Sequence, residues 1–354
     1  MRIAPPLNTI EIDISTHSFE IYRAYDETIY SIGKNIIIPC ARSIMVDITG
    51  SSFLIPPSLN TLQFPSESSE LTRTHEGNEK IRKNSVLIIT ELIKNWPKAR
   101  NSWDLLCCDP ELEAHWECAN YITVQKLGMN DHGKVHAMVA TASALQMLDI
   151  LVKSGIEPDI ISSEMGDLDD AYLIVMIAAL CHDIGNEIHR VDHISHSLLI
   201  VSPILDRILD HIYDEPIQMT RIKTFILSAI YSHHGDPRPL TIEAGAVCIG
   251  DATDMTTGRA RTAYDQGSVT IHTISALSID QVTIKKGDDL PVNIIITMSN
   301  SAGLFQVQEI LAPKIAAGPL TPYIELKIQL TDESSGFEKQ ILSGIKLIQG
   351  SQIK

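Results

Sequence analysis

The sequence predicts a mainly helical, multidomain protein with β structure at both ends. Its 354 residues exceed what a single hydrophobic core usually organises. Residues 109–261 contain one helical pattern after another, whereas residues 1–70 and 267–354 contain segments with the alternating pattern of strands. We therefore expect three regions, which span residues 1–103, 104–266 and 267–354.

The N-terminal region alternates short segments rich in β-branched residues with turn residues. Typical segments are KNIIIPC and SIMVDIT, and they predict a small β-rich domain or extension. The polar stretch FPSESSELTRTHEGNEKIRKN that follows predicts a connecting segment. After it, SVLIITELIKNW predicts a short helix that leads into the central region.

The central region is predicted to be entirely helical. Helix starts are indicated at Asp109, between Asp167 and Asp170, and at Pro203, and Gly185 indicates a stop. After Asp170 the run AYLIVMIAALC carries no charge on any helical face, so we expect this helix to lie in the core.

The C-terminal region changes to a pattern of strands. Strands are predicted at residues 281–285 and 291–298, a helix at 301–316, and further strands at 323–330 and 339–348. This β-β-α-β order predicts a small open α+β sheet with one helical face, loosely similar to ferredoxin-like or ACT-like modules. We expect an oligomerisation module, and hence a homo-oligomer; a regulatory ligand site is the alternative.

The adjacent pair His182 and Asp183 is the most informative motif, because it follows the apolar helix directly. An unpaired carboxylate in that position would be costly to bury, so a bound cation is the simplest explanation. Other segments bring matching residues. His136 lies beside the apolar stripe of one predicted helix, and His233 and Asp251 lie on the apolar faces of two others.

In order along the chain, these residues and His193 resemble the HD phosphohydrolase superfamily. The sequence around them is similar to a group of archaeal HD domain proteins, through NDHG, HDIG, HRVDH, TIEAGAVCIGDATDM, GRAR and the later MSNSAGLFQVQEILAPK. The similarity runs from about Asp109 to about Leu330 and implies an all-helical HD domain over 104–266. The metal ligands that it implies are His136, His182, Asp183, His193, His233 and Asp251.

This resemblance implies a metal-dependent phosphohydrolase. One ion held by His136, His182, Asp183 and Asp251 is the smallest arrangement, and His193 and His233 would allow a second ion, with Asp183 as the bridging carboxylate. A divalent ion lowers the pKa of its water to about 7, so that a metal-bound hydroxide can attack phosphorus. Asp183 and His182 are the expected catalytic residues. The donor types suit Mn, Fe, Ni, Co, Zn or Mg and leave the metal unidentified.

The acidic composition limits the class of substrate. A formal net charge of −16 argues against a nucleic-acid polymer, because phosphate backbones need basic surfaces. A small phosphorylated substrate can instead be bound by metal ions and a few cationic side chains. The candidates are Arg190, Arg259, Arg261 and Lys134, and ordinary surface charge is the alternative interpretation for each of them.

Several neighbouring residues stay ambiguous at this stage. His189, His193 and His196 are predicted to share a helix face at a spacing that could itself hold a cation. Asp254 could orient Arg259, although a solvent-facing acid is the favoured interpretation. His132 could orient a ligand or lie in an exposed loop.

The expected function is hydrolysis of a nucleotide or other small phosphate ester, by a phosphomonoesterase or phosphodiesterase. A non-hydrolytic nucleotide sensor and a di-iron oxygenase on the same scaffold are the alternatives. The N-terminus MRIAPPLNTIEID has no basic segment followed by an apolar one, and the apolar runs are too short to span a bilayer. We therefore expect no membrane partner and a cytoplasmic location.

Overall fold

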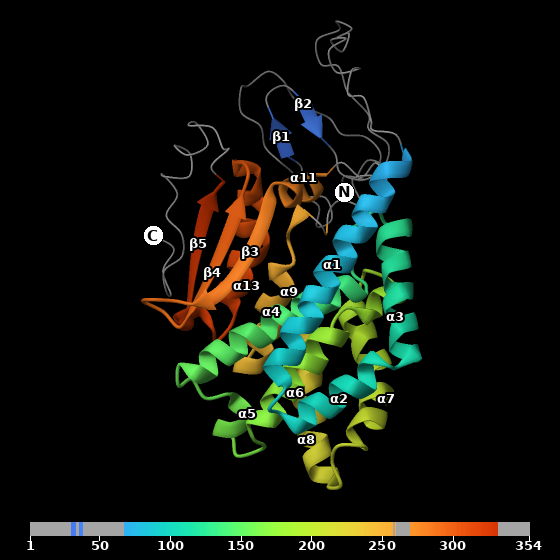
Figure 1. Ribbon diagram of the computed structural model, residues 1–354, viewed down its shortest axis with the longest axis vertical. Helices are drawn as coiled ribbons and strands as arrows, with labels where there is room; N and C mark the ends of the chain where they lie inside the picture. The colour runs from blue at the N-terminus through green and yellow to red at the C-terminus, as the bar shows by residue number, and fades with distance from the viewer. Residues whose placement is uncertain (1–29, 33–34, 38–66, 258, 260–269, 332–354) are drawn as a thin grey trace, which may run out of the picture. The chain divides into compact units, whose positions relative to one another are not determined.

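The computed structural model describes only part of the chain, namely residues 30–32, 35–37, 67–257, 259 and 270–331 (Figure 1). The chain divides into two compact units, residues 1–65 and 66–354. In the first unit, β1 (Tyr30–Ile32) and β2 (Asn35–Ile37) form an antiparallel pair. The other predicted N-terminal β segments lie outside the described residues. The three-region division stays a prediction.

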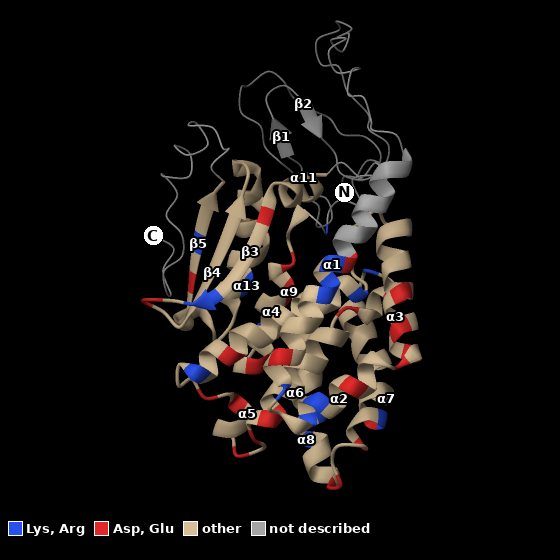
Figure 2. Cartoon of the chain, in the orientation of Figure 1, with Lys and Arg blue, Asp and Glu red and all other residues tan. Residues whose placement is uncertain are grey.

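The second unit begins with α1 (Glu67–Ile93), α2 (Pro97–Cys107) and α3 (Pro110–Asn120). The prediction of a connecting segment before residue 85 is wrong, because most of that polar stretch belongs to α1. Its Glu, Lys and Arg residues are good helix formers, and polarity alone does not prevent a helix. By contrast, α3 begins as predicted: the Asp109 carboxylate accepts the Glu111 N–H at 2.9 Å. Acidic residues follow along α3 (Figure 2).

The centre of the second unit is formed by α4 (Lys134–Lys153), α6 (Leu168–Cys181) and α9 (Ile242–Thr253). The prediction of a core helix is confirmed, because every residue of α6 after Leu168 is buried. A methyl group added at Gly250 would lie 2.8 Å from the Ala140 carbonyl oxygen, so this glycine permits the close approach of α9 to α4. By length and composition α4 could cross a membrane, but it is mostly buried in the protein.

The other helices of this part are α5 (Asp159–Ser162), η2 (Tyr121–Lys126), η3 (Ile184–Glu187), α7 (His193–Leu209) and α8 (Pro216–Tyr231). The predicted stop near Gly185 is confirmed, since α6 ends at Cys181. The predicted start at Pro203 is wrong, because Pro203 lies inside α7. Burial of Val201 and Leu205 on either side of it keeps the helix continuous.

The C-terminal part follows the predicted β-β-α-β order. After the unpredicted α11 (Ile271–Leu277), strands β3 (Ile279–Lys286) and β4 (Val292–Met298) pair antiparallel, and β5 (Ile324–Leu330) joins β4 in parallel. Between β4 and β5 lie η4 (Ser301–Gly303), α12 (Leu304–Gln306), η5 (Val307–Leu311), α13 (Ala312–Ala317) and η6 (Thr321–Tyr323). α13 packs against α9, and β3 packs against α4. The predicted strand at 339–348 lies outside the described residues.

Candidate metal centre

Four of the predicted ligands meet where α4, α6 and α9 converge. His136 Nε2 lies 3.1 Å from His182 Nε2 and 3.2 Å from Asp251 Oδ1. His182 Nε2 in turn lies 3.5 Å from Asp251 Oδ1 and 3.5 Å from Asp183 Oδ2. Both imidazoles are fully buried. The arrangement places two nitrogen and two carboxylate donors around one point.

Asp183 links this group to a second one, because its two oxygens face opposite partners. Oδ2 lies 3.4 Å from His136 Nε2, on the side of the first group. Oδ1 lies 3.4 Å from His193 Nε2 and 3.7 Å from His233 Nε2. The amide of Asn186 also donates to Oδ1, at 2.9 Å, and holds the carboxylate in this orientation.

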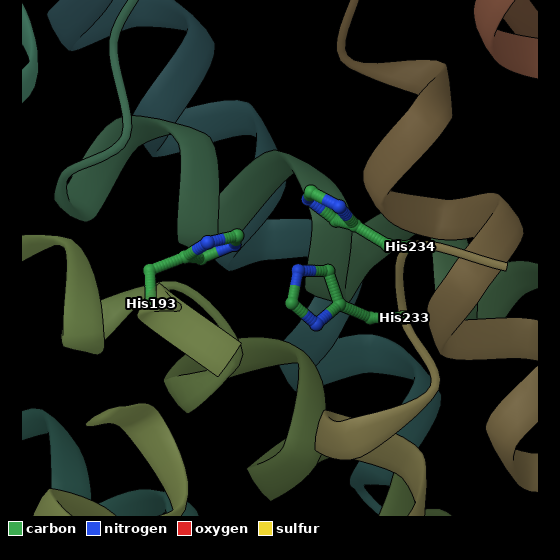
Figure 3. A group of neighbouring side chains, drawn as sticks. All are labelled: His193, His233 and His234. Carbon is green, nitrogen blue, oxygen red and sulfur yellow. The ribbon is translucent and has the colours of Figure 1, made fainter. Parts of the chain in front are cut away.

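His233 and the adjacent His234 extend from the segment after α8 towards His193 at the start of α7 (Figure 3). One nitrogen from each of the three rings lies within 4.8 Å of the others. In a helix that continued beyond Tyr231, His234 would face away from the side on which His233 lies. However, α8 ends at Tyr231, and the chain then turns so that both rings face the same region.

Hydrogen bonds at Nδ1 fix the tautomer of three candidate ligands. Nδ1 of His182 lies 2.8 Å from the Ala179 carbonyl oxygen, and Nδ1 of His233 lies 2.7 Å from that of Ile230. His193 Nδ1 is held in the same way by a carbonyl oxygen at 3.0 Å. Because a carbonyl oxygen can only accept, each Nδ1 carries the proton and each Nε2 keeps its lone pair. This is the tautomer that a metal ligand requires.

Asp254 contacts Nδ1 of His136, in the way that backbone carbonyl oxygens contact Nδ1 of the other three histidines. Its Oδ2 lies 2.7 Å from His136 Nδ1. The favoured interpretation of Asp254 as a solvent-facing acid is therefore wrong, since the residue is 7% exposed and orients a candidate ligand. A carboxylate behind a ligating imidazole fixes the ring and increases its basicity.

The charges of the site favour anionic carboxylates. Burial alone would raise the pKa of both Asp183 and Asp251, but their basic neighbours hold each pKa well below its usual value. Burial and the Arg259 guanidinium lower the pKa of His136, but hydrogen bonds to three aspartates outweigh them and raise it to about 10. Burial and the adjacent imidazoles lower the pKa of His233 well below its usual value.

The donor set fits a divalent cation. His233 Nε2 is buried without a hydrogen-bond partner among the described residues, and an unpaired polar atom of this kind calls for a ligand. Neutral imidazoles and carboxylates are typical ligands of first-row transition metals, and carboxylates also suit Mg²⁺. His136, His182, Asp183 and Asp251 could hold one ion, and His193 and His233 could complete a second site with Asp183.

Comparison with known proteins shows the family of this chain. A family model described as the HD domain matches residues 144–256. An uncharacterized protein of Methanocaldococcus jannaschii is 39% identical over 237 residues, which are 67% of this chain and 91% of that protein. The chain belongs to the HD domain family. No solved structure matches it. Membership of the HD domain family places it in a superfamily of metal-dependent phosphohydrolases.

Arg190 lies beside the candidate metal ligands, which together are called the HD domain centre below. Its Nη1 lies 3.7 Å from Asp183 Oδ1 and donates to His193 Nε2 at 3.2 Å, while Nη2 donates to His234 Nε2 at 3.3 Å. Arg190, one of the four cationic residues predicted to bind substrate, therefore directly contacts the candidate ligands.

The other three predicted substrate-binding residues have different surroundings. Arg259 lies behind the HD domain centre, with Nε 3.6 Å from Asp254 Oδ2. Lys134 forms an ion pair with Glu113 on α3. Arg261 lies outside the described residues.

Some residues near the HD domain centre do not follow the sequence analysis. His189 is exposed and precedes α7, so it does not share a helix face with His193. His132 is buried, with Nδ1 2.6 Å from the Asn130 carbonyl oxygen. Lys314 of α13, whose ammonium group pairs with Asp251, was not predicted to lie at the centre. The signal that could have indicated it is a lysine within the apolar run ILAPKIAAG.

Proposed function

We propose that the protein is a metal-dependent phosphohydrolase that acts on a nucleotide or another small phosphate ester. The observation that carries this proposal is the position of Asp183, whose two oxygens face two pairs of buried imidazoles. A carboxylate shared in this way is suited to two neighbouring cations. The net charge of −16 supports a small substrate over a nucleic-acid polymer.

A bound divalent ion would supply an activated water and offset the negative charge that develops on the phosphoryl group. His136, His182, Asp183 and Asp251 would hold the first ion, and His193 and His233 would complete a second site. The backbone carbonyls and Asp254 keep the imidazoles in their ligating tautomer.

Arg190 would bind the substrate phosphate. Its guanidinium lies against His193 and His234 at the same edge of the centre as Asp183. A planar guanidinium presents several N–H groups in a geometry that suits phosphate oxygens. We also propose a cytoplasmic location and a homo-oligomer, which rest on the sequence pattern alone.

The first experiment combines elemental analysis of the purified chain with a screen for phosphate release from nucleotides and small phosphate esters. Mn²⁺, Ni²⁺, Co²⁺ and Mg²⁺ are added separately to apo protein. We expect one or two metal equivalents and hydrolysis that depends on the metal. Asp183→Ala should abolish both, whereas His211→Ala should change neither, because the exposed His211 ring is held by the carbonyl oxygen of Arg207.

Two results would contradict the proposal. Hydrolysis by exhaustively chelated wild-type protein would exclude the metal mechanism. Oxygen consumption by iron-loaded protein without phosphate release would favour a di-iron oxygenase on the same scaffold.

A further inference from the structure

Each carboxylate of the metal centre that contacts a candidate ligand has a cationic partner of its own. Asp183 lies 3.7 Å from Arg190, Asp254 lies 3.6 Å from Arg259, and Asp251 pairs with Lys314. The three cations come from three different parts of the chain. Within the described residues, the three negative charges of these carboxylates are therefore balanced by the three positive side chains once His136 is neutral, as it is when it binds a metal ion.

A further carboxylate, Asp131, does not alter this balance at the ligands. Its Oδ1 accepts the backbone N–H groups of Gly133 and His136, both at 3.2 Å, at the N-terminus of α4. These hydrogen bonds are therefore made to the backbone of α4 and not to the candidate ligand atoms.

Lys314 is the unusual member of the cationic set, because it lies outside residues 144–256, which match the HD domain. It belongs to α13, which precedes β5 of the C-terminal sheet and packs against α9, the helix that carries Asp251. The side chain of Lys314 is only 11% exposed, and a buried ammonium is costly unless it is paired. The C-terminal part of the chain thus contributes a charge to the HD domain centre.

The two oxygens of Asp251 are divided between Lys314 and the histidines. Oδ2 pairs with the Lys314 ammonium group, while Oδ1 lies 3.2 Å from His136 Nε2 and 3.5 Å from His182 Nε2. Lys314 therefore occupies one oxygen of Asp251, and the other oxygen faces the imidazoles. Lys314 also neutralises the negative charge of Asp251, which would otherwise offset the positive charge of a bound metal ion.

From this we propose that Lys314 is a positioning residue that keeps the metal-loaded centre positively charged and so selects an anionic phosphate as its ligand. Ligating imidazoles are neutral, so the three acid–base pairs leave the charge of each divalent ion uncompensated. An anionic phosphate supplies the missing negative charge. This inference rests on the proposed function, in that it requires a divalent ion at the centre.

Removal of the Lys314 charge should have opposite effects on the binding of a metal ion and on the binding of phosphate. A cation beside Asp251 repels a metal ion and attracts an anion, so Lys314→Met should bind Mn²⁺ about tenfold more tightly and inorganic phosphate about tenfold more weakly. Methionine keeps most of the apolar stem that packs in this position. Lys314→Arg retains the charge and should restore both affinities towards the wild-type values.

The experiment uses the full chain in two steps. Mn²⁺ affinity is measured on apo protein by competition with a chelating dye, and inorganic phosphate is then titrated into the Mn²⁺-loaded protein in a calorimeter. Lys327→Met is the matched control, because Lys327 pairs with Glu325 at 2.8 Å on β5 of the same C-terminal sheet. Neither affinity should change in that variant.

The outcomes separate this inference from the proposed function. If Lys314→Met weakens the binding of both Mn²⁺ and phosphate, or leaves phosphate binding unchanged, the role assigned to Lys314 is wrong. The proposed metal centre is not contradicted by either result. If wild-type protein binds no divalent ion, the proposed function is wrong and the inference is overturned with it.

Discussion

Asp254 Oδ2 lies 2.7 Å from His136 Nδ1, and this contact joins the end of α9 to the first turn of α4. The same α9 carries Asp251, which faces the opposite nitrogen of the His136 ring at 3.2 Å. One helix and its C-terminal cap thus supply both a candidate ligand and the residue that orients another candidate ligand. The imidazole of His136 is held on both sides.

Asp254→Asn should weaken metal binding without removing a ligand. The amide cannot stabilise the imidazole as a carboxylate does, and loss of such a partner typically costs about 10-fold to 100-fold in metal affinity. Competition with a chelating dye measures this effect. Asp210→Asn, an exposed residue after α7, is the control. Equal metal affinity in Asp254→Asn and wild type would show that the contact does not orient the ligand.

Metal binding should release a proton from His136. With its pKa raised to about 10, His136 in the apo protein is protonated at neutral pH, and a ligating nitrogen must lose that proton. The apparent metal affinity should therefore rise with pH until the pH reaches that pKa. Calorimetry in buffers of different ionisation enthalpy measures how many protons are released when the metal ion binds. A binding enthalpy that does not depend on the buffer would contradict this prediction.

His233→Ala should lower the metal content of the protein, whereas His182→Ala should abolish specific binding. His233 faces Oδ1 of Asp183, at 3.7 Å, but His182 lies within 3.5 Å of Asp183, Asp251 and His136. Elemental analysis after dialysis distinguishes the two variants. If both lose metal to the same extent, the two groups of ligands do not form separable sites.

Tyr213→Phe should destabilise the protein without changing the metal centre. The Tyr213 hydroxyl donates to Asp170 Oδ1 at 2.6 Å, and Lys98 donates to the same oxygen at 2.7 Å. Loss of a hydrogen bond to a buried charged group typically costs about 1.5–3 kcal/mol. Chemical denaturation measures the loss. Tyr231→Phe, at an exposed position, is the control, and equal stability of the two variants would contradict this prediction.

The helical core and the residues of the candidate centre could be predicted from the sequence because both follow from local patterns. A charge-free run ends at His182 and Asp183, and an apolar helix must be buried. The start of α3 at Asp109 also follows from a local signal, the N-cap carboxylate. Local patterns were less reliable where a helix continues through unfavourable residues, as α7 does through Pro203.

The residue types available for a metal centre, and their position on or next to apolar helices, follow from the sequence. Their pairing follows from the fold, because Lys314 and Asp251, or Asp254 and His136, are far apart along the chain. Charge compensation depends on the distance between atoms in space, and periodicity along one helix carries no information about a partner on another. The fold therefore determines which carboxylates are paired with a cationic side chain. It thereby also determines where the positive charge of a bound metal ion would remain uncompensated.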